Sequence, residues 1–152
     1  MSFSPAVRMH LISAALPAVD LALPAVAIPT PRRTLAKRLW RGQAADGTEF
    51  GFQLERPLQN GDTVWADRRT RYVIEQVPEA VLAIPLSAAP ELAAVTGWAI
   101  GNLHCPISAD NGRVLTPDEP GLKQALTRMG IAYTEATEVF RAHRFSEFSH
   151  SH

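Results

Sequence analysis

Residues 101–106 read Gly-Asn-Leu-His-Cys-Pro and contain the only cysteine of the chain and a histidine, His104, far from both ends. They follow an apolar segment, residues 92–100, that predicts a helix. Glycine and asparagine tolerate the left-handed conformation of a helix C-cap, so the Gly-Asn pair predicts the end of that helix. Pro106 then prevents the helix from resuming. We therefore expect His104 and Cys105 just beyond a helix end, with His104 as a metal ligand.

The composition is that of an ordinary globular protein. The chain has 152 residues, 46% of them hydrophobic, and its 15 basic and 15 acidic residues give a formal net charge of zero. Balanced charge gives no reason to expect a nucleic-acid or membrane partner. A single cysteine excludes a disulfide within the chain and fits a reducing compartment. We therefore expect a cytoplasmic protein.

Residues 9–28 are apolar enough to be compared with a targeting segment. A secretory signal needs an unbroken apolar stretch of about 7–15 residues, and a membrane helix needs about 18. Pro17 and Asp20 interrupt this segment. We expect short edge strands at residues 8–12 and 20–23; a signal peptide is the alternative.

The first half of the chain alternates strand patterns with turn residues. Asp-Gly at 46–47 and Asn-Gly at 60–61 supply the positive φ angles of tight turns. Residues 48–54 alternate between large apolar and other side chains, and shorter strands are expected at 63–66 and 71–77. Short strands with turns between them predict a small all-β domain.

The second half has a different pattern, which starts at Pro78. Its expected elements are a strand at 80–86, a helix from about residue 90 to 101, strands at 105–108 and 113–115, a helix, and a strand at 133–139. Thr116 and Glu119 have the spacing of a capping box at the start of the second helix. This βαββαβ order is the ferredoxin-like arrangement.

The predicted fold class is therefore α+β, with three parts. Residues 1–77 form the all-β N-terminal domain, residues 78–142 the ferredoxin-like C-terminal domain, and residues 143–152 a flexible polar tail that contains histidines.

Basic residues are numerous around the predicted β domain. They are Arg32, Arg33, Lys37, Arg38, Arg41, Arg68, Arg69 and Arg71. We interpret them as a solvated face that keeps edge strands apart. A patch for an acidic partner is the alternative.

Three further histidines, His143, His150 and His152, lie near the C-terminal end. Imidazoles in a mobile tail suit Ni²⁺, Cu²⁺ or Zn²⁺. His104 alone cannot complete a metal site, but a twofold dimer supplies a second copy of it. A site built from an interface and tails would be open and exchangeable, unlike the closed tetrahedra of structural zinc. His10 is interpreted as structural.

Catalysis by His104 and Cys105 is a second hypothesis. Neighbours on a strand point to opposite faces, so the two would not form a nucleophile–base pair. The sequence has no phosphate-binding loop, no Cys-x-x-Cys and no His-Glu-x-x-His. We therefore expect no enzyme activity. Cys105 is interpreted as a small buried residue, with a soft metal ligand as the alternative.

The Gly-Asn-x-His-x-Pro motif at 101–106, after an apolar helix and before an Asp-containing turn, resembles the UreE family of urease accessory proteins. The resemblance extends to Lys-Arg-Leu at 37–39 before the Asp-Gly turn, and to Asn-Gly-Asp at 60–62 before a strand. It covers most of the chain.

The resemblance implies a nickel metallochaperone. Such proteins are homodimers through the C-terminal domain, and His104 of both protomers would bind one Ni²⁺ at the interface, with His143, His150 and His152 as auxiliary ligands. Nickel would pass to the urease apoprotein through a complex with other accessory proteins, including a GTPase. The N-terminal domain would bind a partner polypeptide. The alternatives are a general Zn²⁺ or Cu²⁺ binding protein and a polypeptide-binding adaptor without catalysis.

Overall fold

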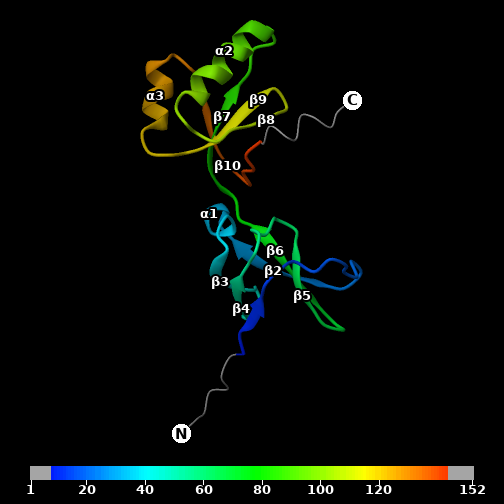
Figure 1. Ribbon diagram of the computed structural model, residues 1–152. Helices are drawn as coiled ribbons and strands as arrows, with labels where there is room; N and C mark the ends of the chain where they lie inside the picture. The colour runs from blue at the N-terminus through cyan, green and yellow to red at the C-terminus, as the bar shows by residue number, and fades with distance from the viewer. Residues whose placement is uncertain (1–7, 144–152) are drawn as a thin grey trace. The chain divides into compact units, whose positions relative to one another are not determined.

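The computed structural model describes residues 8–143, and the chain divides into two compact units, Met1–Val77 (unit 1) and Pro78–His152 (unit 2) (Figure 1). The elements of unit 1 are β1 (His10–Ile12), β2 (Ala25–Thr30), α1 (Arg32–Leu35), β3 (Leu39–Gln43), β4 (Glu49–Gln53), β5 (Thr63–Ala66) and β6 (Arg71–Gln76). Those of unit 2 are β7 (Glu79–Pro85), α2 (Pro90–Gly101), β8 (Ser108–Asp110), β9 (Arg113–Pro117), α3 (Leu122–Arg128) and β10 (Thr134–Glu138). The α+β prediction is confirmed. Within residues 8–143, no helix has both the length and the apolar character that a membrane crossing requires.

Unit 1 contains two three-stranded sheets, with strand orders β1-β4-β3 and β2-β6-β5. The predicted tight turns are confirmed, because Gly47 has φ +90° and Gly61 has φ +91°. Phe50 of β4, Ile28 of β2 and Ile74 of β6 are each at most 1% exposed. They belong to one apolar cluster, so side chains from both sheets share a single core.

Two parts of unit 1 differ from the sequence-based expectation. Residues 20–23 form a turn instead of a strand, because the Asp20 carboxylate accepts a hydrogen bond from the Ala22 N–H, 2.9 Å away. The prediction of an all-β domain also misses α1, a single turn of helix after Pro31. Proline is tolerated there because the first N–H groups of a helix have no partner within it.

Unit 2 is built on one four-stranded sheet with the order β10-β7-β9-β8, in which every neighbouring pair is antiparallel. Helices α2 and α3 pack on one face (Figure 1). On that face Leu82 and Ile84 of β7 contact a cluster that contains Ile100 of α2 and Leu126 of α3. The intervening residues of β7 pack on the opposite face with Phe140, which is 1% exposed. The sheet therefore has apolar side chains on both faces.

Two local predictions in unit 2 are wrong. The strand expected at residues 105–108 begins only at Ser108. Thr116 does not cap a helix, because it lies buried within β9, while α3 begins at Leu122 after a left-handed Gly121 with φ +82°. Burial of Thr116 in the central part of the sheet overrides its local capping preference.

Asp46 connects the β3–β4 turn of unit 1 to β6, and its charge should contribute stability. Its carboxylate accepts hydrogen bonds from the Thr48 N–H (3.0 Å) and the Tyr72 hydroxyl (2.7 Å), which lower the pKa of Asp46 below its usual 3.8. A depressed folded-state pKa gives stability that is present above the unfolded-state pKa and is lost as the pH falls through the folded-state value.

We therefore expect Asp46→Asn to unfold at lower urea concentration than the wild type at pH 7. The difference should shrink as the pH falls from about 3.8 through the lowered pKa of folded Asp46, because the wild-type carboxyl becomes protonated over that range. Urea unfolding followed by tryptophan fluorescence at pH 7 and at acidic pH measures it. Tyr72→Phe removes one of the two donors and should give a smaller change in the same direction. An equal difference at both pH values would contradict the assignment.

Candidate metal centre

The turn that follows α2 determines where His104 lies. The N–H of Asn102 donates to the Trp98 carbonyl at 3.0 Å, and the N–H of His104 donates to the Gly101 carbonyl at 3.0 Å. Asn102 has φ −64° and stays right-handed, so the prediction of a left-handed Gly-Asn cap is wrong. The left-handed residue is His104 itself, with φ +57°. This conformation disfavours an L-residue by about 1–2 kcal/mol, so the turn holds the candidate ligand in an unusual backbone state.

The side chain of His104 is exposed, and within residues 8–143 its imidazole makes no hydrogen bond. A neutral imidazole has one nitrogen with a lone pair for a metal ion and one N–H group. No protein group in the described part of the chain competes for that lone pair. Residue 104 therefore meets the chemical requirement for an accessible metal ligand.

Cys105 does not act together with His104. It is half-buried and packs against the apolar cluster beneath α2 and α3. Its Sγ donates a weak hydrogen bond to the Leu103 carbonyl, 3.6 Å away. The thiol therefore faces its own backbone and the core, while the neighbouring imidazole faces solvent.

Among residues 8–143, the other candidate ligands do not join His104 in a single cluster. Within residues 8–143 there is no group of three or more His, Cys, Asp or Glu side chains that could hold a metal ion. His143 lies beside β8, where its Nδ1 accepts the Ala109 N–H at 3.0 Å. His150 and His152 lie outside the described residues. His10 lies in unit 1, where its ring centroid is 4.4 Å from that of Trp65.

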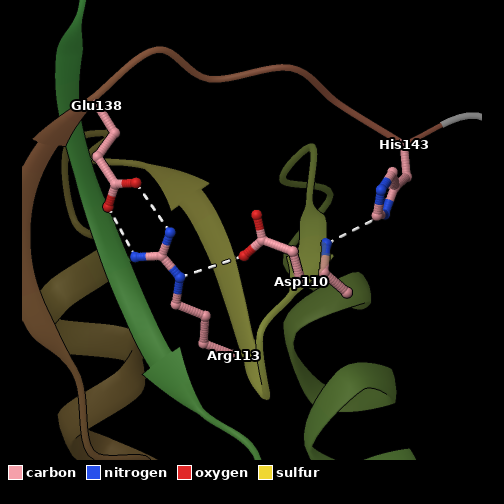
Figure 2. A network of polar contacts seen from close by, with 5 residues as sticks. Asp110, Arg113, Glu138 and His143 are labelled. Carbon is pink, nitrogen blue, oxygen red and sulfur yellow. Dashed lines mark hydrogen bonds and ion pairs between the residues drawn. The ribbon is translucent and has the colours of Figure 1, made fainter.

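Two acidic side chains of unit 2 are already engaged by Arg113 (Figure 2). Its guanidinium donates to both carboxylate oxygens of Glu138, at 2.7 and 2.8 Å, and to Asp110 at 3.2 Å. The bond from Arg113 lowers the pKa of Glu138, and the same pairing raises the pKa of Arg113. These carboxylates are structural partners of Arg113, so they are poor candidates for metal ligands.

Helix α2 has an exposed apolar stripe that runs toward the turn with His104. Leu92, Val95 and Trp98 are 59%, 61% and 69% exposed. Their spacing of three residues places them along one side of the helix. The apolar segment at residues 92–100 predicted the helix but did not tell which of its large side chains stay exposed. The exposed stripe was therefore missed.

Together these features define an α+β protein of two compact units with one solvent-facing histidine at the end of α2. Residues 79–152 match the family model described as "UreE urease accessory protein, C-terminal domain". A urease accessory protein UreE of Deinococcus radiodurans is 33% identical over 126 residues, which cover 82% of this chain and 76% of the relative. The corresponding protein of Bacillus cereus is 28% identical over 120 residues, or 78% of each chain. The chain belongs to the UreE family of urease accessory proteins.

The left-handed conformation of residue 104 predicts which substitutions it tolerates. Glycine and asparagine accept a positive φ, whereas a β-branched residue does not. We expect His104→Asn and His104→Gly to change the free energy of unfolding by less than about 1 kcal/mol, and His104→Val to lower it by about 1–2 kcal/mol. Urea unfolding of the metal-free proteins measures this. Equal stability of the valine and asparagine variants would contradict a left-handed turn at this residue.

Proposed function

We propose that the chain is a nickel metallochaperone that delivers Ni²⁺ to the urease apoprotein during assembly of its active site. The observation that carries this proposal is the exposed imidazole of His104, which has no hydrogen-bond partner among residues 8–143, in a chain of the UreE family. The named relatives are urease accessory proteins UreE, and the resemblance to this family implies the delivery of nickel. A ligand without competing protein contacts suits a protein that must accept an ion and later release it.

We propose that the metal site is completed by a second copy of the chain. One chain offers no cluster of three ligands within its described residues. A twofold axis near His104 would bring two imidazoles together without further sequence requirements. The exposed stripe of Leu92, Val95 and Trp98 supports a homodimer, because large apolar side chains grouped on one helix face are typical of an interface.

We also assign unit 2 to the ferredoxin-like class. The βαββαβ order of its elements and the antiparallel strand order β10-β7-β9-β8 support this assignment. As proposed from the sequence, we assign metal binding and dimerisation to residues 78–142, and we assign residues 143–152 to a tail. His143, His150 and His152 of this tail would be auxiliary ligands.

Nickel is the proposed cargo, and Zn²⁺ or Cu²⁺ are the alternatives, since imidazole ligands suit all three ions. A general divalent-metal binding protein is therefore the closest competing function. Catalysis has less support, because the Cys105 thiol is directed to the Leu103 carbonyl and has no base as a hydrogen-bond partner among residues 8–143. A cytoplasmic location agrees with a single cysteine that forms no disulfide within the chain.

Unit 1 has a groove that suits a partner polypeptide. The groove measures about 940 Å³ and lies over the β1-β4-β3 sheet, with Leu11, Leu39, Arg41 and Gly51 among its lining residues. At Gly51 a Cβ atom would lie 3.1 Å from Leu11, so glycine allows the leucine to cross this strand closely. Two exposed leucines beside an arginine suit an extended segment with apolar residues and a carboxylate. We propose that urease or an accessory protein, including the GTPase, supplies it.

The dimer proposal predicts the stoichiometry of nickel binding. Isothermal titration should give one Ni²⁺ per two wild-type chains at His104, and His104→Asn should lose this tight site. Trp98→Glu places a charge on the apolar stripe and should give monomers, measured by sedimentation, with at least about a tenfold loss of nickel affinity.

Met129→Glu is the matched control, because Met129 is also exposed (42%) but lies outside α2. It should remain a dimer and retain nickel binding. Tight nickel uptake by His104→Asn would reject the metal site. Tight uptake by a monomeric Trp98→Glu protein would reject the two-chain arrangement but would leave the metal site at His104 standing.

The groove proposal predicts a local effect of charge in unit 1. Leu39→Glu should weaken binding of the purified urease apoprotein or accessory GTPase by about tenfold, since it places an acidic group among the apolar lining residues. Leu21→Glu is a close control, because Leu21 is 74% and Leu39 75% exposed, but only Leu39 lines the groove. Surface-immobilised chain titrated with each partner separately measures the affinity. An equal loss in both variants, or no loss in either, would contradict the groove as the docking site.

A further inference from the structure

The five residues after β10, 139–143, form a strap across the face of the unit 2 sheet that faces away from α2 and α3. Phe140 is 1% exposed and packs there against Val81 and Leu115, which come from β7 and β9. The strap starts at one edge strand, β10, and reaches the other edge strand, β8. Figure 2 shows it running from Glu138 to His143 beside the Arg113 network.

Chain length explains why the strap is extended. The sheet order places three strand spacings between β10 and β8, which amount to roughly 14 Å. Five extended residues span roughly 17 Å, so little slack is left between the two edges. Any contact that fixes residue 143 at β8 therefore keeps the whole strap stretched over the sheet.

His143 provides that contact with two hydrogen bonds. Its backbone N–H donates to the Ile107 carbonyl at 2.9 Å. Its Nδ1 accepts the N–H of Ala109 at 3.0 Å. The two bonds join the strap to residues 107–109, which follow His104 directly after Cys105 and Pro106. His143 thus holds the segment that connects the candidate ligand to the sheet.

The side-chain bond also determines the tautomer of His143. A neutral imidazole has one acceptor nitrogen and one N–H. Because Nδ1 accepts the Ala109 N–H, the proton resides on Nε2, and neither nitrogen then has a lone pair left for a metal ion. Metal ligation by His143 and its bond to Ala109 therefore exclude each other.

We propose that His143 is a positioning residue for the His104 turn, and that its imidazole can join a metal site only after it releases Ala109. The hydrogen bond from the Ala109 N–H to His143 Nδ1, called the clasp below, is present in the metal-free chain and does not depend on any role in nickel binding. Its consequence for nickel rests on the proposed function of His104.

The tautomer gives the first test. A long-range proton–nitrogen correlation spectrum of the metal-free full chain should show the His143 proton on Nε2. Detection of the Nδ1–H tautomer would overturn the clasp, since that nitrogen could not then accept the Ala109 N–H.

Substitution by asparagine separates the clasp from metal ligation. The Asn Oδ1 occupies nearly the position of the His Nδ1 and accepts a hydrogen bond, but it cannot replace an imidazole as a nickel ligand. Amide exchange of Ala109 in the metal-free chain should be similar in the wild type and His143→Asn. It should be about three- to tenfold faster in His143→Ala, the range expected for one lost hydrogen bond. Wild-type exchange in His143→Ala, or equally fast exchange in both variants, would overturn the clasp.

Nickel titration of the same two variants tests the positioning role. His143→Asn should bind Ni²⁺ at the His104 site several-fold more tightly than His143→Ala, because only the asparagine variant keeps the turn in place. Equal affinities in the two variants would overturn positioning. Failure of His104→Asn to lose nickel would instead reject the proposed function, and it would leave the exchange and tautomer results as independent tests of the clasp.

Discussion

The site depends on how the chain leaves helix α2. Backbone hydrogen bonds close the turn after Gly101. The chain changes direction at His104, which takes the left-handed conformation. The consequence is an abrupt change of environment between neighbours: His104 is exposed, whereas Cys105 packs against the core of unit 2. A right-handed continuation at residue 104 would extend the helix, and the imidazole would then lie on its surface. The unusual backbone state thus separates the candidate ligand from the helix and from the thiol.

Local chemistry made much of this fold predictable. The Asp-Gly and Asn-Gly turns and β5 were found from the sequence, because tight turns depend on the φ angles of the residues within them. The bounds of α2 were also close, since Pro90 favours a first turn and Pro106 prevents continuation. The prediction of a helix cap at Thr116 was wrong, because the interaction that competes with capping is the pairing of β9 with β7. That pairing involves residues remote in sequence. A capping pattern cannot report that its threonine is needed in a buried strand.

In the candidate site, too, features set by neighbouring residues could be predicted from the sequence, and features set by distant residues could not. His104 could be proposed from six consecutive residues, but the contact of His143 with Ala109 joins positions 34 residues apart. Nothing in the sequence near His143 specifies that partner, and a polar C-terminal segment is ordinarily interpreted as mobile. The exposed stripe on α2 was missed for a related reason. A helix that is apolar on several sides has no periodicity that tells which side its own unit leaves uncovered.

Within residues 8–143, the position of His104 apart from other metal-ligating side chains limits what one chain can do with a metal ion. In the described part of one chain His104 has no second ligand within a cluster, and on the proposed function a second chain supplies the next imidazole. On the proposed function, metal binding and dimerisation are therefore thermodynamically linked, and each stabilises the other by mass action. A pair of imidazoles also leaves coordination positions open, in contrast to the four protein ligands of a structural zinc site. Open positions allow an acceptor to bind the ion before the donor has released it, which is the step that a metal carrier must perform.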